Sequence, residues 1–208
     1  IIPEMFNKTQ ITIDKIVRLI ISSMIKRRIV GQKFGVVVVG EGIFHFLQDE
    51  DIASSGITFD YDAHGHPELS EVSKAHVISK ILKNRLKELN LDIICRPVEV
   101  GYSLRCVDPS AFDLTYCTTL GIGVKKLYDE GHSGCMVAVN LEEEVIPVYL
   151  KDVEDEHGKI RTRLVNIDKE VVRQTLAENI YYLTAQDRSL ARKWLADPEP
   201  FEYERILG

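Results

Sequence analysis

The sequence predicts an α/β protein in which a mainly parallel sheet is flanked by helices and followed by a helical carboxyl-terminal tail. Segments with a helical spacing of apolar residues alternate along the chain with short apolar runs of strand character. The clearest of these runs is continuously apolar, which is typical of a strand buried on both faces of a parallel sheet. With 208 residues, 45% of them hydrophobic, the chain is long enough for one large or two small domains with a core.

The first helix is expected over residues 12–28, where apolar residues recur at intervals of three and four and basic residues occupy the other face. Gly31 ends it, and Lys33 to Gly40 follows as a β-branched strand. Residues 41–67 mix glycine, serine, aspartate and histidine without a period. They indicate a long loop or an insertion.

A second amphipathic helix is expected over residues 68–90, and residues 91–100 have strand character that Pro97 confines to an edge or a bend. Asp108 is expected to cap a third helix, with Pro109 at its first position, running through 110–130 to a stop at Gly131. Another strand is expected over 134–140. An acidic loop over 152–158 and helices over about 168–184 and from 187 complete the pattern.

Charge and cysteine content narrow the class of protein. The chain has 26 basic and 32 acidic residues and a formal net charge of −6, which argues against a nucleic-acid partner. Its four cysteines form no C-x-x-C pair, so reduced thiols in a cytoplasmic protein are expected. The apolar stretches are shorter than the roughly 18 residues of a membrane span, so no membrane partner is expected. The chain opens on Ile1 without a leader, as if in the middle of a fold.

Two groups of residues are candidates for ligand binding. Glu41 follows the most strand-like run, where open α/β sheets bind ligands, and its carboxylate could accept hydrogen bonds from sugar hydroxyls. Arg96 and Arg105 bracket Tyr102 around a glycine turn, a combination suited to a phosphate monoester. The alternatives are a solvated loop glutamate and surface arginines that are hydrated or paired with carboxylates.

Other patterns favour ordinary structural explanations. His64, His66 and Glu68, with Asp60 and Asp62 upstream, could hold a metal, but a zinc site needs three or four converging ligands and a turn explains the glycine and proline equally well. Basic residues over 151–163 interleave with acidic ones, as in a solvated hairpin. Cys106 has no partner base in the sequence, and no glycine-rich phosphate loop is present. We therefore predict no metal ligand and no catalytic residue in this chain.

Four motifs in order, IIPE, FGVVVVGEG, RPVEVGYSLRCVDPSAFDLTYCTTLG and GHSGCMVAVN, resemble those of the phosphofructokinase family over roughly residues 1–140. The tyrosine in GY-x-x-R is similar to that of the pyrophosphate-dependent branch. The resemblance implies the family's fold, transfer of a phosphoryl group from pyrophosphate or ATP to the 1-hydroxyl of fructose 6-phosphate, and magnesium as cofactor.

The same resemblance implies roles for individual residues. Glu41 would bind the sugar hydroxyls, and Tyr102 to Arg105, with Ser103 and Leu104 between them, would hold the phosphate end of the substrate. Arg96 matches an arginine that reaches the same phosphate across a subunit interface, so a homo-oligomer is expected. Residues 1–108 would be part of the fructose 6-phosphate-binding domain. Residues 109–208 would return toward the donor domain and form the tail.

The family's glycine-rich donor motif and its T-I-D-x-D catalytic motif are missing. Thr12-Ile13-Asp14 and Thr58 to Asp62 imitate the latter in the wrong context. The chain thus resembles a carboxyl-terminal half, expected to be inactive alone, with magnesium bound mainly by the other half. The alternatives are a catalytically silent sugar-phosphate-binding or regulatory subunit, and a generic sugar-phosphate-binding domain with a chance motif match.

Overall fold

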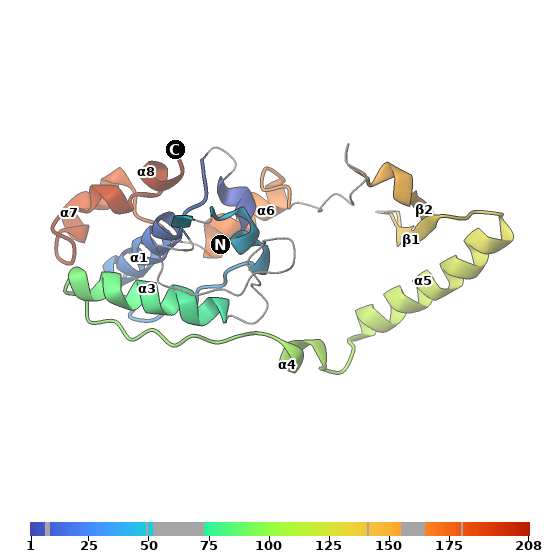
Figure 1. Ribbon diagram of the computed structural model, residues 1–208, viewed down its shortest axis with the longest axis horizontal. Helices are drawn as coiled ribbons and strands as arrows, with labels where there is room; N and C mark the ends of the chain where they lie inside the picture. Colours follow the sequence, from blue (N-terminus) through green and yellow to red (C-terminus); the bar gives the residue numbers. More distant parts are fainter. Residues whose placement is uncertain (7–8, 49, 52–72, 141, 155–164, 180) are drawn as a thin grey trace. The chain divides into compact units, whose positions relative to one another are not determined.

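The computed structural model describes residues 1–6, 9–48, 50–51, 73–140, 142–154, 165–179 and 181–208 (Figure 1). The chain forms two compact units, and each is described by itself. Unit 1 comprises Ile1–Glu99 and Val165–Gly208, and unit 2 comprises Val100–Leu164. Both helices and strands are present, which confirms a mixed helix and strand class.

Unit 1 is helical. It contains α1 (Ile13–Ile29), α3 (Lys74–Glu88), α6 (Glu170–Asn179), α7 (Arg188–Ala191) and α8 (Tyr203–Leu207), with short 3₁₀ turns η1 (Pro3–Phe6), η2 (Glu41–Phe46), η4 (Ala185–Asp187) and η5 (Glu199–Phe201). None of the helices in the described part of the chain is long and apolar enough to cross a membrane.

Helix α1 is the centre of unit 1 and forms where its spacing predicted. The Thr12 hydroxyl caps it by accepting a hydrogen bond from the Lys15 amide at 3.2 Å. Basic residues in the last turn suit the negative end of the helix dipole. Gly31 follows with a φ of +85°, the left-handed conformation that favours glycine after a helix end. Four large side chains of α1 are completely buried: Ile16, Leu19, Ile21 and Ile25.

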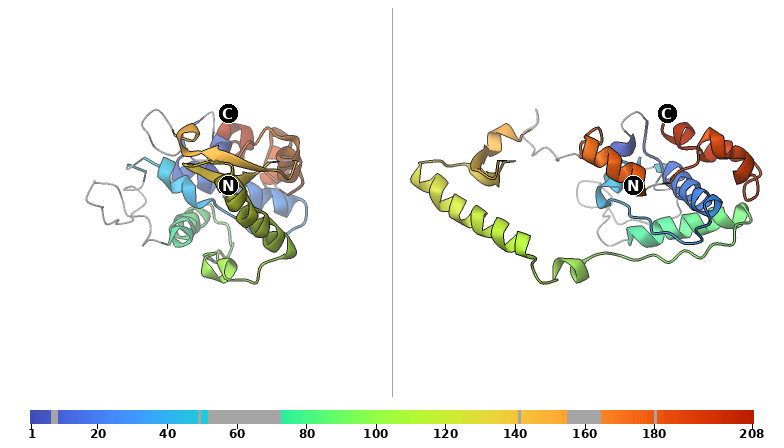
Figure 2. Two further views of the ribbon diagram at one scale, coloured as in Figure 1. Left: turned by 90° about the vertical axis from the view of Figure 1, so that its right-hand side faces the viewer. Right: turned by 180° about the vertical axis from the view of Figure 1, so that it is seen from behind.

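Helix α3 lies beside α1 in both Figure 1 and Figure 2 and contributes a second layer to the core. Its apolar face buries Val77, Ile78, Leu82 and Leu86. The Ser73 hydroxyl caps the helix by accepting from the His76 amide at 3.3 Å. The described helix begins six residues after the predicted start, and residues 68–72 lie outside the described residues.

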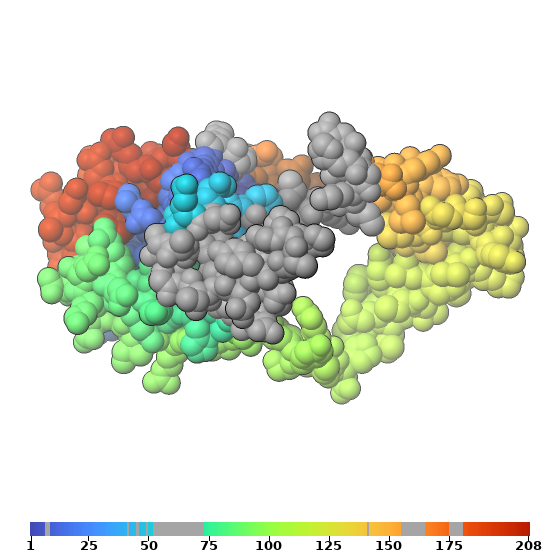
Figure 3. All heavy atoms as spheres, viewed as in Figure 1, coloured from blue at the N-terminus to red at the C-terminus, as the bar shows by residue number. Residues whose placement is uncertain are grey.

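The carboxyl-terminal tail packs back onto α1, so the two ends of the chain share one core; the blue and red ends adjoin in Figure 3. The buried Ser22 hydroxyl accepts a hydrogen bond from the Leu183 amide at 2.9 Å. The Lys26 ammonium donates to both Asp187 carboxylate oxygens, at 2.7 and 2.8 Å. Arg188 makes a bidentate pair with Glu202. The contacts of Ser22 and Lys26 connect residues 161 positions apart.

Unit 2 consists of α4 (Tyr102–Arg105), α5 (Ala111–Asp129), β1 (Cys135–Val139), β2 (Val145–Tyr149) and a turn, η3 (Leu150–Asp152). The strands are antiparallel, and Cys135 pairs with Tyr149. Helix α5 packs on this hairpin through Gly123, where an added Cβ would lie 2.7 Å from Val137 and 2.8 Å from Val145. A side chain at this position would therefore push the helix off the strands.

The start of α5 corrects one sequence expectation. Ser110, and not Asp108, is the cap: its hydroxyl accepts from the Asp113 amide while the Asp113 carboxylate accepts from the Ser110 amide. Pro109 consequently lies before the cap instead of at the first helical position. The reciprocal pair satisfies two amides of the helix start, which gives Ser110 the advantage.

The predicted parallel sheet is not confirmed. The described strands are the two of the unit 2 hairpin, and β2 was not predicted. Residues 33–40 and 91–100 are extended, but neither belongs to a sheet in the described structure. The expectation that residues 33–40 are buried on both faces is wrong, because Phe34, Val36 and Val38 are 79%, 88% and 74% exposed. No layer of the described chain covers that face.

Candidate substrate-binding site

Glu41 begins the 3₁₀ turn η2, directly after the extended segment 33–40. Ile43 and Phe44 of this turn are buried in the core. The Ile43 amide donates a hydrogen bond to the Gly40 carbonyl at 3.1 Å. The backbone of Glu41 therefore follows the extended segment 33–40, although that segment is not the sheet strand that the sequence predicted. Its side chain lies outside what the structure describes.

Arg96 lies in the extended segment 91–100 of unit 1. Burial alternates along this segment: Leu91, Ile93 and Cys95 point toward the core, and Arg96 is on the exposed side with its even-numbered neighbours. Burial raises the pKa of the Cys95 thiol, although the nearby Lys83 acts in the opposite direction. The Arg96 guanidinium faces solvent without a carboxylate partner among the described side chains.

Tyr102, Ser103, Leu104 and Arg105 make up the single helical turn α4, and all four are exposed. The turn is closed by the Gly101 carbonyl, which accepts from the Leu104 amide at 3.1 Å, and by the Cys106 amide donating to the Tyr102 carbonyl at 2.8 Å. Tyr102 and Arg105 are three residues apart, so their side chains are neighbours on one face of the turn. A phenol hydroxyl and a guanidinium side by side can both donate to one phosphate group.

Tyr102 and Arg105 both belong to the turn α4 of unit 2, while Glu41 and Arg96 belong to unit 1. The grouping of all six predicted residues around one substrate stays a prediction. Arg96 and Arg105 form no ion pair in the parts of the chain that the structure describes. Both guanidinium groups are therefore available for an anion.

The weaker sequence candidates have mostly structural explanations or lie outside the described residues. Thr12 caps α1, and Asp14 pairs with Arg18 at 2.6 Å, so Thr12-Ile13-Asp14 has a structural role at a helix start. All four cysteines are free, and Cys106 is exposed. The histidines at 64 and 66, the carboxylates around them and the Thr58 to Asp62 segment fall in 52–72, outside the described residues. Within the described ranges no three histidine, cysteine, aspartate or glutamate side chains gather as a metal site would require.

Sequence reasoning missed two hollows in the surface of unit 1. A hollow of about 250 Å³ is lined by Arg28, Gly31, Lys33 and Trp194. It combines two cations with an aromatic ring in a chain whose net charge is negative. No local signal could have revealed it, because Trp194 comes from the tail and the other residues from the end of α1. A second hollow, of about 330 Å³, lies at the end of α3 around Lys87 and Asn90. Neither hollow is lined by a predicted site residue.

Comparison with known proteins gives consistent results. No family model matches the chain. A protein of Naegleria fowleri named pyrophosphate–fructose 6-phosphate 1-phosphotransferase is 31% identical over 179 residues, which cover 82% of this chain and 41% of that protein. A Thermotoga maritima protein of the same name is 29% identical over 204 residues, covering 96% of this chain and 46% of that protein. An Arabidopsis thaliana protein named as subunit beta 2 of this enzyme is 21% identical over 211 residues, covering 76% of this chain and 37% of that protein.

The chain spans less than half the length of these relatives, and it matches their carboxyl-terminal part. The resemblance that the four motifs indicated is confirmed.

Proposed function

Because this chain is a relative of the pyrophosphate-dependent phosphofructokinases over most of its length, we propose that it forms the acceptor-binding part of such an enzyme. The whole enzyme would transfer a phosphoryl group from pyrophosphate to the 1-hydroxyl of fructose 6-phosphate. The observation that supports the proposal for this chain is the exposed turn α4, in which Tyr102 and Arg105 are three residues apart. The mainly parallel sheet of the family is part of the same proposal.

Arg105 and Tyr102 would bind the 6-phosphate. A guanidinium can donate two parallel hydrogen bonds to a phosphate dianion, and the phenol hydroxyl adds a third. Ser103 and Leu104 would support the phosphate from the backbone of the same turn. Arg96 would reach the phosphate of a neighbouring subunit in a homo-oligomer. Glu41 would accept hydrogen bonds from the sugar hydroxyls and orient the ring.

The reaction that these residues would serve is an in-line displacement. The oxygen of the 1-hydroxyl forms a bond to a phosphorus of pyrophosphate, the bridging P–O bond breaks, and inorganic phosphate leaves with the electron pair of that bond. The hydroxyl gives up its proton to a base that we do not place in this chain. Binding the 6-phosphate and the ring at fixed points would hold the 1-hydroxyl in position for attack, which is the contribution of this part of the enzyme.

Magnesium belongs to the proposal for the whole enzyme and not to the residues described here. The ion prefers carboxylate and water oxygens, and the described side chains do not offer three such ligands at one place. We therefore derive no step of the reaction through the ion in this chain.

The experiment compares Arg105→Ala with Arg173→Ala in the full-length protein. Arg173 is also an exposed arginine, but it pairs with Glu170 on α6 and has no part in the proposed site. Loss of a charged hydrogen bond is worth about 1.5–3 kcal/mol, so we expect KM for fructose 6-phosphate to rise roughly 10- to 150-fold in Arg105→Ala. KM for pyrophosphate should change little, and Arg173→Ala should behave like the wild type. An unchanged KM for the sugar phosphate in Arg105→Ala would contradict the proposed role.

Two outcomes would favour the alternatives. A full-length protein that binds fructose 6-phosphate tightly, depends on Arg105 for it and has no turnover with pyrophosphate or ATP would be a silent or regulatory subunit. A full-length protein that does not bind the sugar phosphate would contradict the proposed acceptor site. Turnover by the 208-residue chain alone would overturn the expectation that it is inactive.

A further inference from the structure

The hollow of about 250 Å³ at the carboxyl-terminal end of α1 is lined by the ring of Trp194 and by two cationic side chains, Arg28 and Lys33. All of its lining residues belong to unit 1. Gly31 completes the lining with a φ of +85°, and a Cβ added there would meet nothing within 4 Å apart from its chain neighbours. The glycine therefore leaves open space beside the ring and the two cations.

Trp194 is anchored in the folded unit. It is half-buried and packs against the core of unit 1. The Trp194 amide donates to the Ala191 carbonyl at 2.9 Å, and the Lys193 ammonium lies 5.3 Å from the centroid of the indole ring in a cation–π contact. An anchored, half-buried ring gives a flat surface on which another planar ring can stack.

Positive charge around this hollow exceeds what the end of α1 requires. Residues 15–40 include six basic residues and no acidic one. Two of the six pair with carboxylates, Arg18 with Asp14 and Lys26 with Asp187. The negative end of a helix dipole is equivalent to about half a charge, which one further cation already offsets. The remaining positive charge is available to a bound anion.

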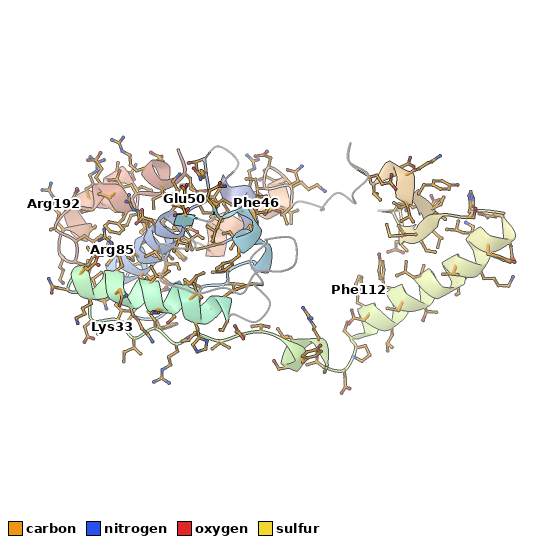
Figure 4. All side chains as sticks on the ribbon, viewed as in Figure 1. Lys33, Phe46, Glu50, Arg85, Phe112 and Arg192 are labelled. Atoms are coloured by element: carbon orange, nitrogen blue, oxygen red, sulfur yellow. The ribbon has the colours of Figure 1, made fainter. Side chains whose placement is uncertain are left out.

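Arg28 and Lys33 supply the hydrogen-bond donors of the hollow. One Arg28 amino group donates to the Asp92 carbonyl at 3.1 Å, which holds the guanidinium in place and leaves its other N–H groups without a partner in the described part of the chain. Lys33, labelled in Figure 4, is exposed and makes no hydrogen bond or ion pair with any described residue. A guanidinium and an ammonium of this kind can together bind one carboxylate or phosphate group.

We propose that this hollow binds a small anion that carries a single planar ring. The ring would stack on the indole of Trp194, and the anionic group would accept hydrogen bonds from Arg28 and Lys33. Sites for drug-sized ligands have about 300–1,000 Å³, and this hollow, at about 250 Å³, is smaller. It therefore suits one ring and not a dinucleotide, and the net charge of −6 disfavours a nucleic-acid strand. None of these residues belongs to the proposed fructose 6-phosphate site, so the two proposals stand or fall separately.

The test observes Trp194 itself in the full-length protein labelled with 5-fluorotryptophan. Its ¹⁹F resonance is the one that disappears in Trp194→Phe. Phenyl phosphate combines a ring with an anion, and we expect it to shift this resonance saturably and to bind roughly 5- to 150-fold more tightly than inorganic phosphate, which cannot stack. Phenol supplies the ring without the charge and should also bind more weakly. No shift with phenyl phosphate would overturn the proposal, and so would equal affinity for phenol or for inorganic phosphate.

Two lysine variants test the role of the charge. Lys33→Gln removes the exposed cation of the hollow, so the affinity for phenyl phosphate should fall about 3- to 10-fold. Lys80→Gln is the matched control, because Lys80 is exposed on α3 and does not line the hollow, and its affinity should equal that of the wild type.

Isothermal titration calorimetry measures both lysine variants without the fluorine label, so the result stands even if Trp194→Phe does not fold. Saturating fructose 6-phosphate is added to occupy the proposed substrate site, so that the heat reports the hollow. An unchanged affinity in Lys33→Gln, or an equal loss in the two variants, would contradict the proposed site.

Discussion

Units 1 and 2 differ in where their apolar side chains lie. Unit 1 buries a continuous cluster that draws on α1, α3 and the tail. Unit 2 buries only Gly123 and Leu127 along α5 among the described residues, while Phe112, labelled in Figure 4 near the start of the helix, is 72% exposed and stacks on Tyr116. This difference indicates that the buried side chains that stabilise unit 1 come mostly from unit 1 itself. Unit 2 presents apolar surface that other polypeptide would have to cover.

The largest expected effect comes from emptying the core of unit 1. Ile21→Ala should lower the free energy of unfolding by about 2–5 kcal/mol, since Ile21 is completely buried and its loss leaves a cavity. Ile122→Ala on α5 is the matched change in unit 2. Ile122 is 66% exposed, so we expect an effect within about 0.5 kcal/mol. Urea unfolding followed by far-ultraviolet circular dichroism measures both variants, and the fluorescence of the single tryptophan, Trp194, reports unit 1 separately. Equal losses in the two variants would break the comparison.

Removing an ion pair should also lower stability more in unit 1 than in unit 2, with a smaller loss than emptying the core. Lys26→Ala leaves the buried Asp187 carboxylate without its ammonium, and we expect a loss of about 1.5–3 kcal/mol. Lys125→Ala removes an exposed pair with Asp129 on α5 and should change stability by less than about 0.5 kcal/mol. If thermal unfolding finds the two variants alike, the pair to the tail does not stabilise unit 1.

The pH dependence gives the Lys26 prediction a second measurement. Burial acts to raise the pKa of Asp187, but hydrogen bonds from Lys26 and Thr184 outweigh it and hold the pKa below its ordinary value. A carboxylate with a lowered pKa adds stability above its unfolded-state pKa, near 4, and loses it as the pH falls through the folded-state value. Unit 1 should therefore lose stability below about pH 4, and this dependence should be weaker in Lys26→Ala.

Two buried serines on the helices of unit 1, Ser22 and Ser79, allow the effect of a lost hydrogen bond on stability to be distinguished from the effect of burying a hydroxyl. Ser22→Ala leaves the Leu183 amide without an acceptor, and we expect a loss of about 1–3 kcal/mol. Ser79 is also buried, but its hydroxyl has no partner in the described structure. Ser79→Ala should consequently be neutral or slightly stabilising. A larger loss for Ser79→Ala than for Ser22→Ala, measured by the same urea unfolding, would contradict the role of the contact between α1 and the tail.

The last comparison lies within unit 2 and concerns two glycines of α5 that are two residues apart. Alanine at 121 meets open space and should gain up to about 1 kcal/mol of helix stability. Alanine at 123 makes the same gain but meets Val137 and Val145, so Gly123→Ala should be about 1–3 kcal/mol less stable than Gly121→Ala. Hydrogen exchange of the α5 amides measures the difference. Identical behaviour would mean that α5 does not pack on the hairpin.

Local signals account for what could be predicted from the sequence. The apolar period over residues 12–28 and the stop at Gly31 are local patterns, and α1 follows both. Strand β2 was not predicted, and it has Pro147 at its centre, a residue that interior strands of a sheet usually exclude. It is tolerated here because the hairpin has two strands, so each strand has a free edge. The contacts of the tail with α1 could not be predicted, because no local pattern relates Ser22 to Leu183.

In the candidate site, too, features that depend on neighbouring residues could be predicted and features that depend on distant segments could not. The expected roles of Glu41, Tyr102 and Arg105 depend on short spacings along the chain; Glu41 begins η2, Tyr102 and Arg105 lie on one helical turn, and their roles stay predictions. The expectation that residues 33–40 are covered on both faces depended on other strands and helices being present. An apolar run indicates that a segment is meant to be covered, but it does not indicate by which part of the protein.

The composition of unit 1 from both ends of the chain has a consequence for the order of events during synthesis. The contact between Ser22 and Leu183 spans 161 positions, and unit 2 is made between its two partners. At about 5–20 residues per second, a ribosome needs roughly 8–32 s to produce the tail after α1 has been translated. For that interval the apolar face of α1 lacks its final cover. Nascent chains of this protein should therefore be clients of chaperones that bind exposed apolar helices until translation ends.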